Sequence, residues 1–117
     1  MGREYNVIDA DGHILEPVDL WDNYMEPTFR ARAPRMFVDT DGKDRLNIDG
    51  TIIGGPRGLG RLGGIGLRDG RVPEEMKYVE GRKGGFDPHA RIVDLDLDGI
   101  DAAFLYPSIG LFSGAID

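Results

Sequence analysis

The sequence predicts an α/β fold, and three observations support this prediction. Two short and mostly apolar runs, one with Tyr5, Val7 and Ile8 and the other at residues 102–106, have the character of buried parallel strands. A helical pattern follows the first run, and a helix with signals at both of its ends precedes the second. This order indicates one βαβ unit, interrupted by an insertion over about residues 36–84.

Length and charge narrow the classes of function. At 117 residues the chain is long enough for one domain or a piece of one. Acidic residues outnumber basic ones by 21 to 14, and the net charge of −7 argues against a nucleic-acid partner. No apolar run approaches the length of a membrane span, and residues 1–5 lack signal-peptide character, so no membrane partner is expected.

The chain contains no cysteine. This excludes disulfide scaffolds and thiolate metal sites, and it is compatible with the cytoplasm, which is the expected location. Any metal must therefore be held by nitrogen and oxygen ligands.

The first strand is predicted to end near Asp11 and Gly12, which are turn-forming residues. From Glu16 to Met25, apolar residues recur at approximately helical spacing, and Pro17 suits a first helical turn. We expect a helix of two to three turns here. The following basic stretch, residues 27–35, contains two prolines and cannot form a long regular element.

The insertion begins with a predicted β-hairpin. Residues 36–53 contain short apolar runs around Asp41-Gly42, and a second Asp-Gly pair follows at 49–50, where a tight turn requires positive φ. Residues 54–70 are nearly half glycine and predict an irregular loop without a core-facing side. Three arginines of this loop suit an acidic substrate, although a solvated loop without a ligand is an equal alternative: Arg57, Arg61 and Arg68.

The last third of the chain has clearer signals. Asp87 is a good N-cap, Pro88 fits the first helical position and Gly99 fits the position just after the end, so residues 88–98 are predicted to be helical. The alternation of residues 93–98 favours a strand, but the caps outweigh it. A second strand is then predicted from Ala102 to Tyr106.

The stretch with the most chemical character lies where the first strand ends. Side chains alternate in a strand, so Asp9, Asp11 and His13 point to one side if the extended conformation continues to residue 13. Carboxylate oxygen and imidazole nitrogen both suit zinc, manganese or iron. The alternative is an ordinary turn at Asp11 and Gly12 with His13 on the surface, and the spacing alone does not decide between the two.

Two separated segments resemble one known family. VIDADGHILEPVDLWDNYMEPTFRARAPR and GGFDPHARIVDLDLDGIDAAFLYPSIGL are similar to the N-terminal part of the metal-dependent amidohydrolase-related family, which includes aminocarboxymuconate-semialdehyde decarboxylase and γ-resorcylate decarboxylase. The resemblance covers residues 5–35 and 84–112 and does not extend to the glycine-rich middle. It implies the N-terminal part of a (β/α)₈ TIM barrel, with a divalent metal at the carboxyl ends of the strands.

The resemblance also implies site residues and chemistry. Asp11 and His13 correspond to the first two metal ligands, and Asp11 stands where many members have histidine. Asp9 and Glu16 lie close enough in sequence to orient these ligands or the substrate. The implied reaction is hydrolysis or nonoxidative decarboxylation of a small carboxylated molecule, in which the metal activates a water or polarises the substrate.

A complete barrel takes about 250 residues, so this chain holds less than half of one. The later ligands of the family would fall beyond residue 117, because the only other histidine, His89, belongs to a helix start. We expect a truncated chain that is inactive alone; a split protein and a small derived domain are the alternatives. A noncatalytic domain that assembles with itself or a complementing chain through exposed strand edges is the second hypothesis.

Overall fold

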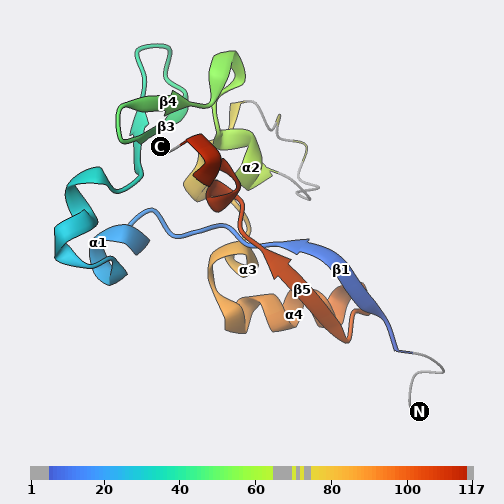
Figure 1. Ribbon diagram of the computed structural model, residues 1–117. Helices are drawn as coiled ribbons and strands as arrows, with labels where there is room; N and C mark the ends of the chain where they lie inside the picture. Colours follow the sequence, from blue (N-terminus) through green and yellow to red (C-terminus); the bar gives the residue numbers. More distant parts are fainter. Residues whose placement is uncertain (1–5, 65–69, 71, 73–74, 116–117) are drawn as a thin grey trace.

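The structure is a computed structural model that describes residues 6–64, 70, 72 and 75–115 (Figure 1). Strands β1 (Ile8–His13) and β5 (Ala102–Tyr106) form a two-stranded parallel sheet. Helices α3 (Lys83–Phe86) and α4 (Pro88–Asp98) lead into β5. The predicted βαβ unit is confirmed, and the predicted start and end of the second strand match β5.

Helix α4 begins and ends where its caps predict. The Asp87 side chain accepts hydrogen bonds from the backbone N–H groups of His89 and Ala90, and Gly99 ends the helix in the left-handed region at φ 74°. The N–H of Ala90 is the main reason that the pKa of Asp87 lies below its ordinary value. Local capping therefore prevails over the strand-like alternation of residues 93–98.

Strand β1 contains an irregularity beside the candidate site. Asp9 pairs with Ala103, and Gly12 pairs with Leu105, so three steps along β1 face two along β5. One extra residue on β1 forms a bulge, which breaks the simple alternation of side chains. A Cβ on Gly12 would lie 2.9 Å from the Leu105 side chain, so glycine allows the two strands to approach here.

The first helix is shorter than predicted. Helix α1 spans Leu20–Tyr24, and Pro17 lies before it, outside its first turn. Glu16 also lies outside the helix because its carboxylate and its carbonyl bind other parts of the chain, as described below. A 3₁₀ helix, η1 (Pro27–Arg32), follows, in agreement with the absence of a long regular element in the basic stretch.

The predicted hairpin is part of a three-stranded antiparallel sheet. Strands β2 (Arg35–Val38), β3 (Asp44–Ile48) and β4 (Thr51–Ile53) pair in sequence order. Asp49 and Gly50 connect β3 to β4 with φ values of 48° and 92°. Asp-Gly predicts a tight turn because these residues readily adopt positive φ, and both positions have positive φ in the structure.

The glycine-rich segment contradicts the prediction of an irregular loop without a core. It contains the 3₁₀ helix η2 (Gly55–Arg57) and the short helix α2 (Gly60–Gly64), and Leu59 between them is buried. A Cβ on Gly60 would lie 1.6 Å from the carbonyl oxygen of Met76. Glycine is used here for close backbone packing, which composition does not reveal. Residues 65–69, including Arg68, lie outside the described residues.

The core lies at the insertion, away from the β1–β5 sheet. Its buried members come from β3, from the segment before α2, from the 3₁₀ helix η4 (Tyr78–Glu80) and from η5 (Ile109–Ala115): Leu46, Ile48, Leu59, Tyr78 and Ile109. Because η5 follows β5, this core also joins the insertion to the carboxyl end of the parallel sheet.

The parallel strands are exposed, contrary to the prediction that they are buried. Ile8 of β1 is 60% exposed and Phe104 of β5 is 63% exposed. The radius of gyration is 16.1 Å, whereas an ordinary domain of this length has about 13 Å. The described residues thus form a loosely assembled structure, in which large apolar side chains of the parallel sheet are exposed.

Within the described part of the chain, no helix combines the length and the apolar character that crossing a membrane requires.

Candidate functional site

The structure brings the two predicted metal ligands together at the end of β1. Nε2 of His13 lies 3.4 Å from Oδ1 of Asp11. The His13 side chain is 39% exposed and that of Asp11 is 86% exposed, so a dissolved ion can reach both. Strand β1 continues to residue 13, as this convergence requires, although the bulge between Asp9 and Gly12 interrupts the regular alternation.

The other nitrogen of the His13 ring is held by the chain that follows β5. Nδ1 lies 3.0 Å from the carbonyl oxygen of Pro107. A carbonyl oxygen only accepts hydrogen bonds, so Nδ1 carries the proton in this contact. In the neutral ring Nε2 then presents a lone pair toward the Asp11 carboxylate. Two electron-pair donors are then 3.4 Å apart, and a cation between them, either a proton or a metal ion, would interact favourably with both.

The separation of the two donors fits a metal ion. Nitrogen and oxygen ligands of one tetrahedral zinc, at about 2.0–2.2 Å from the metal, lie roughly 3.4 Å from each other. Imidazole and carboxylate are also donors that zinc, manganese and iron accept. Within the described residues, no group of three or more histidine, aspartate or glutamate side chains is placed to hold a metal. The Asp11–His13 pair therefore fits part of a metal site, with two of its ligands.

Asp9 lies beside the pair and faces the backbone. Its Oδ1 accepts a hydrogen bond of 3.0 Å from the N–H of Asp11. This contact spans the bulge in β1 and fixes the backbone of Asp11. Asp9 and His13, but not Asp11, line a common hollow.

Glu16 is buried, with 4% of its surface exposed, and it binds the turn after β5. Its two carboxylate oxygens accept hydrogen bonds from the backbone N–H groups of Ser108, Ile109 and Gly110, each with a shortest distance of 3.0 Å. The Ser108 hydroxyl donates to the carbonyl oxygen of Ile14 at 2.6 Å. These contacts join the carboxyl ends of β1 and β5. Sequence reasoning named Glu16 but not its partners, which are more than 90 residues away.

Tyr78 connects Glu16 to the core. Its hydroxyl donates to the Glu16 carbonyl oxygen at 3.0 Å, and its ring meets Phe86 edge-on at a centroid distance of 5.7 Å. Its backbone N–H donates to the buried Asp44 carboxylate at 2.6 Å. Burial, and then the nearby charge of Glu16, raise the pKa of Tyr78 well above its ordinary value. Tyr78 is therefore a neutral structural hydrogen-bond donor.

A hollow of about 750 Å³ extends from His13 along α3 and α4, and it contains two arginines that sequence reasoning did not select. Arg91 donates to the carbonyl oxygens of His13, at 2.6 Å, and Gly84, at 2.9 Å. Arg82 pairs with Asp94. Both guanidinium groups are thus bound within the chain, and Arg91 fixes the backbone of His13 from the side of α4.

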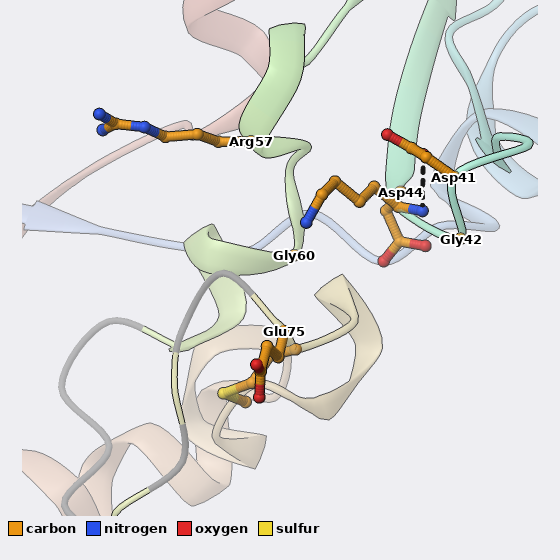
Figure 2. A pocket seen from close by; sticks show the side chains of 8 residues that line it. Asp41, Gly42, Asp44, Arg57, Gly60 and Glu75 are labelled. Atoms are coloured by element: carbon orange, nitrogen blue, oxygen red, sulfur yellow. Dashed lines mark hydrogen bonds between the residues drawn. The ribbon is translucent and has the colours of Figure 1, made fainter.

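A smaller hollow of about 240 Å³ lies in the insertion (Figure 2). Asp41, Asp44, Arg57 and Glu75 are among its lining residues. Figure 2 shows Arg57 extended away from the two aspartates, so these charges do not converge on one point. Arg57 does not line the hollow next to His13, and Arg61 is exposed. The suggested contact of the loop arginines with an acidic substrate stays a prediction.

Comparison with known proteins shows the fold. No family model matches the chain, and no curated protein matches it. Among solved structures, it is similar to the crystal structure of an amidohydrolase from Mycobacterium avium subsp. paratuberculosis K-10, with a TM-score of 0.61 and 23% sequence identity. The match covers 93% of this chain and 31% of that one, so this chain spans about a third of the amidohydrolase. The complete (β/α)₈ barrel stays a prediction, whereas the α/β fold of part of an amidohydrolase structure is shown.

Proposed function

We propose that this chain contributes to a metal-dependent hydrolase or nonoxidative decarboxylase that acts on a small carboxylated substrate. Asp11 and His13 are two ligands of its divalent metal, which is zinc, manganese or iron. The observation that carries this proposal is the 3.4 Å separation of Asp11 Oδ1 and His13 Nε2. Their position at the carboxyl end of a parallel strand, where α/β folds place their sites, supports it.

The residues of this chain have distinct tasks in the proposed centre. His13 offers the Nε2 lone pair because Pro107 holds its other nitrogen. Asp9 fixes the backbone of Asp11, and Arg91 fixes that of His13. A bound metal would supply Lewis-acid activation of a water molecule or of a substrate oxygen. The hollow beside His13 offers room for a small substrate.

Further ligands must come from polypeptide outside the described residues, because those residues place only two donors together. The exposed parallel sheet supports this view, since additional strands would extend it on either side. We therefore expect the 117-residue chain alone to bind the metal weakly and to show no turnover.

Zinc binding by the purified chain tests the assignment. Isothermal titration with Zn²⁺ is expected to detect one weak site in the wild-type protein. Asp11→Ala and His13→Ala should each abolish that binding, because a single remaining ligand does not hold the ion. Circular dichroism spectra of both variants should match the wild type, since neither side chain is buried and neither belongs to the core.

His89→Ala is the matched control, because His89 is exposed at the start of α4 and is the only other histidine of the chain. This variant should bind Zn²⁺ as the wild type does. Wild-type affinity in both Asp11→Ala and His13→Ala would disprove the metal assignment.

A second candidate function is noncatalytic: a domain that assembles with another copy or with a complementing chain. The observation that favours it is the two-stranded parallel sheet, in which β1 and β5 each have only one neighbouring strand within the described residues. Apolar side chains on both strands, such as Ile8 and Phe104, are exposed.

Light scattering at micromolar concentration distinguishes this second candidate. Assembly through the sheet predicts oligomers that Phe104→Lys dissociates, because a charge on the exposed strand opposes its burial. A monodisperse monomer at all concentrations would count against self-association.

A further inference from the structure

One peptide group connects the buried carboxylate of Glu16 to the ring of His13. The Pro107 carbonyl oxygen accepts from His13 Nδ1 at 3.0 Å. The N–H of the same peptide group, which belongs to Ser108, donates to Glu16 Oε1 at 3.0 Å. Both polar ends of this peptide are therefore occupied, one by the candidate metal ligand and the other by the carboxylate.

The geometry of a peptide group makes these two contacts dependent on each other. The peptide is planar and trans, so its N–H and C=O point in opposite directions and turn together. A carboxylate that fixes the N–H thereby fixes the direction of the C=O. The negative charge on the N–H side also polarises the peptide, which strengthens the hydrogen bond that its carbonyl accepts.

Glu16 is itself held firmly. Its oxygens accept from two more backbone N–H groups, those of Ile109 and Gly110, and its own carbonyl accepts from the buried Tyr78 hydroxyl. This series of hydrogen bonds therefore runs from Tyr78 in the core to the imidazole of His13 at the end of β1.

We infer that Glu16 is a positioning residue for His13 and acts through the Pro107–Ser108 peptide. It keeps the proton of the neutral ring on Nδ1 and directs the Nε2 lone pair toward Asp11. Histidine ligands of metals commonly donate their second N–H to a carboxylate or a carbonyl, which sets the tautomer. Here the Glu16 carboxylate acts on His13 through the peptide group whose carbonyl belongs to Pro107. The consequence for metal binding rests on the proposed function, but the effect on the tautomer does not.

Nitrogen NMR of the metal-free, full-length chain reads the tautomer directly. The chain has only two histidines, so ¹⁵N-labelled histidine gives two ring systems, with exposed His89 as an internal reference. At mildly alkaline pH, wild-type His13 is expected to show a protonated Nδ1 and an unprotonated Nε2. A ring protonated at Nε2 would overturn the inference without any variant.

Glu16→Gln tests the role of the carboxylate. Glutamine keeps the shape of the side chain but offers an N–H₂ group where one oxygen accepts from the backbone. We expect His13 to become a mixture of both tautomers and Zn²⁺ binding to weaken about tenfold or more. Ser108→Ala removes only the hydroxyl and keeps the N–H, so it should leave the His13 tautomer unchanged.

Asp44→Asn is the matched control for loss of a buried carboxylate. Asp44 is buried and accepts a backbone N–H, that of Tyr78, but it has no contact with the Pro107–Ser108 peptide. This variant should lower stability and leave the His13 resonances unchanged. A folded Glu16→Gln protein with the wild-type tautomer would refute the inference, as would an equal effect of Asp44→Asn.

The outcomes separate this inference from the proposed function. One outcome is that the wild-type protein fails to bind Zn²⁺ while Glu16→Gln still removes the tautomer preference of His13. That result would support the positioning role of Glu16 and reject the metal assignment. If Glu16→Gln does not fold, two measurements on the wild-type protein test the inference: the tautomer of His13 and the hydrogen exchange of the Ser108 N–H. Slow exchange together with a protonated Nδ1 would support the inference, and rapid exchange would contradict it.

Discussion

Gly60→Ala is expected to lower the free energy of unfolding by about 3 kcal/mol or more. The added methyl group would lie 1.6 Å from the carbonyl oxygen of Met76 and 2.6 Å from its carbonyl carbon. Backbone atoms cannot rotate away as a side chain does, so α2 and the segment before η4 must separate. That movement would open the packing around Leu59 in the core. Urea denaturation followed by circular dichroism measures the effect.

Gly114→Ala is the control for this prediction. A Cβ at Gly114 would have no atom within 4 Å, so the change should alter stability by about 0.5 kcal/mol at most. If Gly60→Ala is as stable as Gly114→Ala, the described approach between α2 and Met76 is wrong.

Tyr78→Ala is expected to lower the free energy of unfolding by about 3–5 kcal/mol, the usual cost of removing a large buried aromatic side chain. Tyr78 is fully buried and is part of the core that joins the insertion to the turn after β5. Tyr78→Phe should cost only about 1–2 kcal/mol, because it keeps the ring and removes one hydrogen bond to Glu16. Equal losses in the two variants would contradict the assigned role of the ring.

The raised pKa of Tyr78 adds a dependence on pH to this comparison. A pKa that is higher in the folded state contributes stability that is fully present below the ordinary value of 10.0 and is lost as pH rises through the folded pKa. The wild-type protein should therefore lose stability more steeply above pH 10 than Tyr78→Phe does. Thermal unfolding of both proteins at several alkaline pH values measures the difference.

Capping residues in the sequence predicted the elements whose ends are determined by neighbouring residues. Helix α4 begins at the Asp87 cap and ends at Gly99, and both contacts involve neighbours in the sequence. Helix α1 was predicted too long because apolar residues recur at helical spacing and Pro17 suits a first helical turn, whereas the Glu16 side chain binds N–H groups more than 90 residues away. Such a contact leaves no periodic trace in the sequence.

The glycine-rich segment shows a second limit of sequence reasoning. Its composition predicted a loop without a core, but Gly60 and Gly63 allow α2 to approach the backbone of Met76 and Tyr78. A high glycine content is compatible both with close backbone packing and with an irregular loop, so composition does not distinguish the two. The exposed parallel strands show the same limit, because an apolar run indicates a preference for burial and does not identify the covering layer.

At the site, strand alternation predicted that Asp11 and His13 approach each other, but it did not predict the bulge between Asp9 and Gly12. The structure adds the contacts that orient the ring and the backbone of His13, which come from Pro107, Glu16 and Arg91. All three depend on the chain returning to the end of β1, so they could not be predicted from the motif itself.

Paramagnetic broadening by Mn²⁺ shows directly which side chains of this protein bind a divalent cation. We expect a small fraction of an equivalent of Mn²⁺ to broaden the ring resonances of His13 and to leave those of His89 sharp. Excess Zn²⁺ should restore the His13 signals, and Asp11→Ala should prevent the broadening. Equal broadening of both histidines, or broadening of neither, would contradict a cation site at Asp11 and His13.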